Sequence, residues 1–320
     1  MDALSDVLRA VRLTGAVFFD VYASEPWVAE APPGRAIVGQ IFPGAEHLIP
    51  YHVVVSGTCW GHVVGDAPRQ LVTGDVIVFP HGDPHVMSSA PGMRGTPRIE
   101  LYRPPSDGHL PFTLTMGSER PEPTRIVCGF LGCDARPFNP LLSALPHVLV
   151  VNERAGGTLN ELVRLAIAES KQPRMGGQCV LGHLSEVMFV DVVRRHLESL
   201  PSEQTDWLAA LRDRFVGRAL AALHASPTRD WTLEGLAREV GLSRSALAER
   251  FTAFVGQPPM QYLASWRMQL AATHLMNGIE SVAEIADRVG YESEAAFSRA
   301  FKKAVGVSPG QWRKHRLARA

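Results

Sequence analysis

The chain has 320 residues, of which 46% are hydrophobic and 20% charged, and 32 basic residues balance 32 acidic ones. This length accommodates about two domains. With four cysteines, no secretory leader and no long apolar run, the sequence is typical of a reduced, cytoplasmic protein and argues against a disulfide scaffold or a membrane protein.

The neutral total hides a charge difference between the two ends of the chain. Residues 208–320 carry 16 Lys and Arg against 10 Asp and Glu, a net charge of +6. Residues 1–207 carry 16 against 22, a net charge of −6. Because basic residues supply the phosphate contacts that dominate nucleic-acid affinity, we expect only the C-terminal end to lie on DNA.

The front of the chain predicts a short helix followed by a β-rich domain. Met1–Thr14 has charged residues at helical spacing, which favours an amphipathic helix packed on a β-barrel. From Ala36 to about Leu131, short β-rich runs such as YHVVVSG, DVIVFP and TRIVCGF alternate with glycine and proline turns. Many short strands with regular turn signals are typical of a sandwich or barrel.

Within this region, residues 74–85 read GDVIVFPHGDPH. The segment resembles the second sequence motif of the cupin barrels, and the matching residues are Gly74, Pro80, Gly82 and His85. In metal-binding cupins the position of His85 is a metal ligand. The companion histidine motif is reduced here to EHLIPYH, in which His47 lies near the expected place and His52 has the strand parity to point inward. A cupin oxygenase needs an intact facial set of histidines and a carboxylate, which this chain does not show.

The same region predicts a different metal site. His81 and His85 lie four residues apart in a turn, and Cys128 and Cys133 lie five apart at the end of a later strand. Two imidazoles and two thiolates suit Zn²⁺ or another divalent transition metal, provided that the two segments meet. The alternative is structural: His85 as a satisfied turn histidine, Cys128 as a small buried hydrophobe and Cys133 without a role. His52 is a further candidate for contact with an effector.

Two helices are predicted after the barrel. Residues 158–167 have one apolar face, whereas residues 178–198 are apolar over more than one face. The second face must be buried against a partner subunit or against the barrel itself, and the sequence leaves both open. Residues 197–213, broken by Pro201, are typical of a linker.

The last hundred residues contain the same pattern twice, about 50 residues apart: a helix, a glycine turn and a second helix. In each copy an apolar stripe stops at a glycine, Gly241 or Gly290, and a serine, Ser243 or Ser293, caps the next helix. The other matched pairs are Ala237 with Ala286, Phe251 with Phe301, Gly256 with Gly306, Pro259 with Pro309 and Tyr262 with Trp312. Small residues where two helices cross, and glycine between them, favour the geometry that lays the second helix into a DNA major groove. A pair of αα-hairpins without a ligand is the alternative.

The stretch from Phe215 to Leu317, with GLSRSALAERF, SVAEIADRVGYES and FSRAFKKAVGVSP, closely resembles the AraC/XylS family of transcription regulators. The resemblance covers about a third of the chain. It implies two recognition helices in successive major-groove segments, held apart by a helix from Pro259 to Met276, in which Arg267 takes the place of the family's recurrent arginine. It also implies a cupin-like sensing or dimerising domain ahead of the DNA-binding module, which favours a homodimer.

The resemblance places the solvent-facing starts of the two recognition helices, and these are our candidates for base contact: Arg244, Ser245, Ala248, Glu249, Glu294, Ala295, Ser298 and Arg299. Lys302 and Lys303 are added as phosphate contacts. Arg299 has the donors for a bidentate contact to guanine, and Glu249 or Glu294 is able to accept from cytosine. Alternatively, either acidic residue stabilises a helix N-terminus.

Together these patterns predict an α+β protein: a cupin-like β-barrel with flanking helices, then an all-α module of two helix-turn-helix units. The expected limits are residues 1–200 for a sensing and dimerisation domain, 201–214 for a linker and 215–320 for a DNA-binding domain. The leading hypothesis is a transcription regulator, not an enzyme, that senses a small molecule or a metal ion. Its expected partners are promoter DNA, a second copy of the chain and RNA polymerase, with no membrane. The alternative is a cupin-type metalloenzyme with an appended DNA-binding module.

Overall fold

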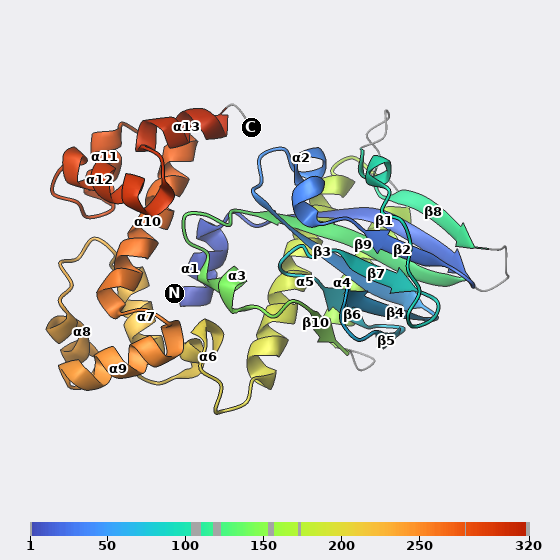
Figure 1. The fold of residues 1–320 in the computed structure, drawn as a ribbon, viewed down its shortest axis with the longest axis horizontal. Coiled ribbons are helices and arrows are strands. Elements are labelled where there is room, and N and C mark those ends of the chain that lie inside the picture. The colour runs from blue at the N-terminus through green and yellow to red at the C-terminus, as the bar shows by residue number, and fades with distance from the viewer. Residues whose placement is uncertain are drawn as a thin grey trace. The chain divides into compact units, whose positions relative to one another are not determined.

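The computed structural model describes residues 2–103, 110–117, 123–152, 157–171, 174–278 and 280–317. The contacts within the chain divide it into two compact units (Figure 1). The barrel unit comprises Leu13–Cys133 and Leu145–Ser199. The helical unit comprises Met1–Arg12, Asp134–Ala144 and Leu200–Ala320. The limits that the sequence predicts for domains and linker stay predictions.

The barrel unit is built from two sheets. The larger has the strand order β10-β6-β3-β9-β1-β8, antiparallel except for the parallel pair β1 and β8, and the smaller has the order β2-β7-β4-β5. The strands are β1 (Thr14–Ser24), β2 (Val28–Ala31), β3 (His47–Ser56), β4 (Thr58–Val63), β5 (Arg69–Val72), β6 (Val76–Val78), β7 (His85–Ser88), β8 (Phe112–Gly117), β9 (Thr124–Cys133) and β10 (Leu149–Val151). Short helical turns lie at η1 (Gly34–Ala36), α2 (Val38–Ile41) and η2 (Ile99–Tyr102).

The central strands of the larger sheet are buried on both faces. On β9, Ile126, Cys128 and Phe130 join the core between the sheets, while Val127 packs with residues of α4 (Thr158–Lys171) and α5 (Gly177–Ser199). Two glycines make the close approach of α5 to β1 feasible. A Cβ on Gly15 would lie 2.4 Å from the carbonyl oxygen of Gly182, so any side chain at that position would separate the helix from the sheet.

Helix α5 buries one side and leaves part of the other in solvent. Its residues Leu181, Phe189 and Val193 are buried, whereas Val180 and Val187 keep 42% and 50% of their surface exposed. The barrel therefore covers one of the two apolar sides that the sequence indicates. Burial of the other side by a partner subunit stays a prediction.

The helical unit contains α1 (Ala3–Ala10), α3 (Pro140–Ala144), α6 (Trp207–Arg212), α7 (Val216–Ala225), α8 (Leu233–Val240), α9 (Arg244–Val255), α10 (Pro259–Asn277), α11 (Val282–Arg288), α12 (Glu294–Val305) and α13 (Pro309–Leu317). Helix α1 belongs to this unit, where it contacts α3, α7 and α10. The prediction that it packs on the barrel is wrong. An amphipathic pattern shows which face of a helix is buried but not which element covers it.

The duplicated pattern forms two helix-turn-helix units, α8 with α9 and α11 with α12. Gly241 and Gly290 have φ angles of 82° and 80°, the left-handed region in which glycine avoids the Cβ clash. The hydroxyls of Ser243 and Ser293 accept hydrogen bonds from the backbone N–H of Ala246 and Ala296, as expected of N-caps. The predicted α+β fold class is confirmed. Among the residues that the structure describes, no helix is long and apolar enough to cross a membrane.

Candidate nucleic-acid interface and barrel cavity

The second helix of each helix-turn-helix unit is held by aromatic and aliphatic residues on one side only. Leu247 and Phe251 of α9, and Phe297 and Phe301 of α12, are fully buried. The predicted base-contacting residues lie on the other side: Arg244, Ser245, Glu249, Glu294, Ala295 and Arg299 are exposed, and Ala248 and Ser298 are half-buried. Both recognition helices therefore present a continuous surface at their N-terminal ends. Contact of these residues with bases stays a prediction.

Basic side chains extend this surface along α12. Lys302 and Lys303 are exposed one turn beyond Arg299, and the structure describes no ion pair for any of the three. Arg250 on α9 differs, because its guanidinium binds both carboxylate oxygens of Asp213, which lies just before α7. The second unit thus offers more unpaired positive charge for phosphate contact than the first.

Helix α10 joins the two helix-turn-helix units through one arginine. The guanidinium of Arg267 donates to the carbonyl oxygens of Pro227 at 2.7 Å and Arg229 at 3.2 Å, both in the loop before α8. It also donates to the carbonyl oxygen of Gly290, at 3.1 Å, in the turn of the second unit. Arg267 therefore links the loop before the first unit to the turn of the second unit. The sequence resemblance had located this arginine without showing what it binds.

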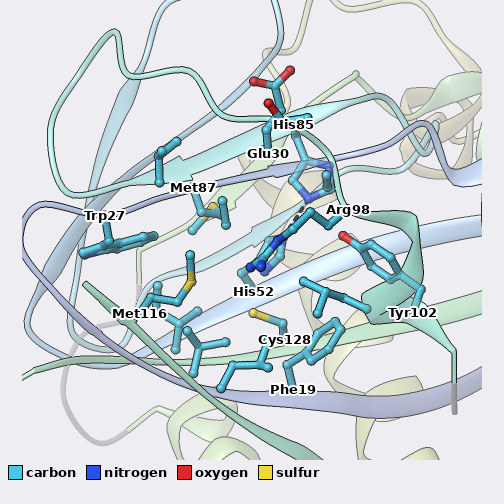
Figure 2. A pocket seen from close by; sticks show the side chains of 18 of the residues that line it. Phe19, Trp27, Glu30, His52, His85, Met87, Arg98, Tyr102, Met116 and Cys128 are labelled. Carbon is cyan, nitrogen blue, oxygen red and sulfur yellow. Dashed lines mark hydrogen bonds between the residues drawn. The ribbon is translucent and has the colours of Figure 1, made fainter. Parts of the chain in front are cut away.

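The barrel unit encloses a cavity of about 110 Å³ between its two sheets (Figure 2). Its walls are mainly apolar and come from both sheets and the turn η2. The residues labelled in Figure 2 are Phe19, Trp27, Glu30, His52, His85, Met87, Arg98, Tyr102, Met116 and Cys128. Arg98 is exposed, and Glu30 is bound by the guanidinium of Arg94. The polar groups inside the cavity are therefore those of the two histidines, the indole of Trp27, the hydroxyl of Tyr102 and the thiol of Cys128.

His52 of β3 and His85 of β7 are connected by a hydrogen bond. The Nε2 atoms of the two rings are 2.8 Å apart, and Nδ1 of His85 lies 2.9 Å from the carbonyl oxygen of Asp83. Burial lowers the pKa of His85 to about 4 and the pKa of His52 well below its usual value. Both rings are therefore neutral at pH 7.

The hydrogen bonds of His52 and His85 determine which ring nitrogens carry a hydrogen. A carbonyl oxygen only accepts, so Nδ1 of His85 carries the hydrogen and Nε2 of His85 must be an acceptor. His52 then donates from its own Nε2, and Nδ1 of His52 is left with a lone pair. That Nδ1 is buried and has no hydrogen-bond partner among the described residues. The indole N–H of Trp27, another residue of the cavity wall, also lacks a described partner.

The four residues of the predicted metal site do not come together in the described structure. His85 and Cys128 line the cavity, and Cys128 lies directly opposite His52 in the β3–β9 register. The ring of His81 bonds instead to the carbonyl oxygen of Leu145, with 2.8 Å between the atoms, and lies against His147. Cys133 is paired with His47 at the far end of β9. Five residues separate the two cysteines on one strand, so their side chains lie on opposite faces of the sheet.

The cavity residues fit a resident metal poorly. The Nε2 atoms of His52 and His85 satisfy one another, and burial raises the pKa of the Cys128 thiol, which opposes the thiolate form that binds metals. Among the described parts of the chain, no cluster of three or more His, Cys, Asp or Glu side chains has metal-binding geometry. A metal ion as cofactor or effector stays a prediction.

Sequence reasoning missed most of the cavity wall. Trp27, Tyr102 and Met116 lie in segments without a motif, and only the pairing of strands brings them to His52 and His85. His52 was found from strand parity, but the hydrogen bond that defines its protonation depends on a residue 33 positions away.

Comparisons with known proteins cover nearly the whole chain. A cupin family model matches residues 2–198, and a helix-turn-helix domain model matches residues 236–315. The chain is 32% identical to a putative AraC-like transcription regulator of Streptomyces lividans, over 98% of this chain and 99% of that protein. It is 30% identical to the RCS-specific transcriptional activator RclR of Escherichia coli, over 98% and 97%, and 27% identical to the transcriptional regulator AlkR of Acinetobacter baylyi, over 98% and 99%.

Among solved structures, the DNA-binding domain of AdpA in complex with a target DNA is similar to part of this chain. It is 29% identical, with a TM-score of 0.32, and the match covers 33% of this chain and 96% of that one.

Proposed function

Because the chain belongs to the AraC-like family of transcription regulators, we propose that it recognises a specific promoter sequence and that a small effector in the barrel cavity changes this binding. The observation that carries the first part is the pair of exposed recognition helices, in units that Arg267 links through the loop before α8 and the turn at Gly290. An enzymatic role finds no support among the similar proteins, which are named as transcription regulators.

The DNA-binding part is tested by fluorescence anisotropy on duplexes that tile the DNA around the chain's own gene. We expect one fragment to bind well above random duplex and to weaken steeply with salt. Arg299→Ala should cost about 1–3 kcal/mol on that fragment and less on random DNA, whereas Lys302→Ala should weaken both and reduce the salt slope by about one.

Arg238→Ala is the matched control, because this exposed arginine lies on α8 and is paired with Glu234. It should change the affinity for the preferred fragment by less than threefold, roughly the effect of one screened surface charge. Equal binding to every fragment and to random duplex would end the proposal of sequence-specific recognition.

Two chain segments that connect strands of the cavity wall with the helical unit support the proposal that an effector changes DNA binding. Strands β1 and β9, which contribute cavity residues, continue directly into residues 3–12 and 134–144 of the helical unit. There Gln269 of α10, only 1% exposed, donates to the carbonyl oxygen of Ala10 and accepts from the backbone N–H of Phe138. The helix between the recognition units is thus bound to both segments. An effector acts on DNA binding only if its affinity differs between two states of the protein.

We also propose that the chain assembles as a homodimer. Val180 and Val187 are seven residues apart on α5 and therefore share a face, and both are exposed. Val187→Lys should turn a dimer into a monomer in sedimentation equilibrium, while Val72→Lys, at an equally exposed valine on β5, should leave the mass unchanged. A wild-type chain that sediments as a monomer would contradict this assembly.

The competing proposal is that the effector is a metal ion. It rests on His85 and Cys128, the two predicted ligands that line the cavity. Metal analysis of purified wild type and of the double variant Cys128→Ser, Cys133→Ser decides it: equal and negligible metal in both removes this version.

A further inference from the structure

The cavity in the barrel unit specifies the chemistry of its ligand. We propose that it binds a small neutral molecule of about the size of a benzene ring that carries one hydroxyl or N–H donor, and that Nδ1 of His52 accepts this hydrogen bond. This inference rests on the proposed effector function and names the ligand class of that site.

The size of the ligand follows from the volume of the cavity. Its 110 Å³ is somewhat below the roughly 150 Å³ of an engineered apolar cavity that binds benzene. The walls include the side chains of Phe19, Met87, Met116 and Ile126, which favour an apolar ring or short chain.

The need for a donor follows from the proton positions. Because Asp83 accepts from His85 and His85 accepts from His52, Nδ1 of His52 offers a lone pair and no hydrogen. Leaving a buried acceptor without a partner costs about 1–3 kcal/mol, so a donor that reaches it gains that amount in addition to burial of its apolar body.

The donor requirement discriminates against two common ligand classes. A carboxylate at Nδ1 of His52 would place its negative charge against the lone pair, where neither cavity histidine is protonated at pH 7 to balance it, and the arginine of the wall, Arg98, is exposed. A pure hydrocarbon would leave Nδ1 unsatisfied. The oxygen of a hydroxyl ligand remains an acceptor, which suits the second unpartnered group of the wall, the indole N–H of Trp27.

Three probes of similar size test the inference by isothermal titration calorimetry on the full chain without DNA: phenol, toluene and benzoate. Toluene has the shape of phenol without the donor and is the more hydrophobic of the two, so burial alone predicts that toluene binds more tightly. We expect phenol to bind about tenfold more tightly than toluene and benzoate to bind most weakly. Toluene binding as tightly as phenol, or benzoate binding most tightly, would overturn the inference.

Substitutions test which atoms accept the hydrogen bond. His52→Phe alone would free Nε2 of His85 as an acceptor in the same wall, so the double variant His52→Phe, His85→Phe is the one that removes both lone pairs, and in it toluene should bind at least as tightly as phenol. His62→Phe is the matched control, because it removes a buried, unpartnered histidine nitrogen that does not line the cavity, and it should keep the preference for phenol. A preference for phenol that persists in the double variant would show that another group is the acceptor. The wild-type series stands on its own if the double variant does not fold.

The outcome separates this inference from the proposed function. If phenol binds with the expected preference but leaves DNA affinity unchanged in anisotropy, the ligand class holds and the effector role fails. If no probe binds while one promoter fragment is still preferred, the ligand class fails and the DNA-binding role holds.

Discussion

Each of the two units contains a buried group of neutral histidines and aromatic rings, and in each group one histidine nitrogen has no hydrogen-bond partner among the described residues. In the helical unit, Nε2 of His224 lies 2.8 Å from the hydroxyl of Tyr262, and that hydroxyl accepts from the indole N–H of Trp207. His224 also stacks on Trp266, with ring centroids 4.1 Å apart. The unpartnered atom there is Nδ1 of His224, whereas in the barrel unit it is Nδ1 of His52, a residue that lines a cavity.

The difference teaches how buried polar residues divide into structural and ligand-binding ones. The hydroxyl of Tyr262 accepts from Trp207 and so donates to Nε2 of His224, which leaves a hydrogen on Nδ1 of His224; this atom faces a carboxylate oxygen of Asp6 at 3.8 Å, beyond hydrogen-bond distance. Such a group stabilises packing between helices. The barrel group instead leaves an acceptor unsatisfied on a residue of a cavity wall, which costs stability and favours a ligand that removes the cost.

Acid should produce the largest effect, because it acts on both groups. Burial lowers the pKa of His85 to about 4 and of His224 to about 3, and also lowers the pKa of His52, whereas an unfolded histidine titrates near 6.5. The unfolded chain therefore takes up protons first as pH falls, so the stability present above pH 6.5 is lost between about pH 6.5 and 4.

Between pH 7 and pH 5 this linkage amounts to about 2 kcal/mol each for His85 and His224, and His52 contributes in the same direction. Urea unfolding followed by circular dichroism at pH 7, 6 and 5 measures the loss. Unfolding free energies that stay constant over this range would mean that the histidines are not buried as neutral groups.

Removal of the Tyr262 hydroxyl should lower the free energy of unfolding. Tyr262→Phe leaves the indole N–H of Trp207 and Nε2 of His224 without a partner at once, so we expect a loss of about 2–3 kcal/mol in urea unfolding. Tyr291→Phe in the same unit is the control, because no hydrogen-bond partner is described for its half-buried hydroxyl. Its loss should stay below about 1 kcal/mol. Equal losses for the two variants would show that the helical group is not held by its hydrogen bonds.

The smallest effect is expected from His52→Phe. The variant removes the unsatisfied Nδ1 of His52 but leaves Nε2 of His85 without its donor, so the number of unpartnered atoms does not change. The unfolding free energy at pH 7 should therefore stay within about 1 kcal/mol of wild type. A loss as large as that of Tyr262→Phe would place His52 among the structural histidines and remove the contrast between the units.

The two helix-turn-helix units were predictable from sequence because their determinants are local. A left-handed glycine, a serine cap three residues before the N–H that it binds and aromatic residues at helical spacing all act within about twenty residues. The buried positions repeat accordingly, with Leu236, Ala237 and Val240 matched by Ile285, Ala286 and Val289. The link between the units was less accessible, since Arg267 binds carbonyl oxygens up to 40 residues away.

The barrel was predicted only in part. Strand pattern and motif located His85 and, by parity, His52. Parity also contained the signal that Cys128 and Cys133, an odd number of residues apart on one strand, point to opposite faces. No such signal existed for His81, whose partner Leu145 lies 64 residues away.

By itself, the sequence determined the class of the protein, its duplicated recognition helices and the basic charge of its C-terminal part, because propensity, capping and periodicity are properties of neighbouring residues. The tertiary structure alone decided which unit contains the first helix, which histidines meet and which buried nitrogen of the cavity wall lacks a partner among the described residues. These outcomes depend on strand register and on contacts between distant segments, where the burial of each side chain is set by residues that no local pattern identifies.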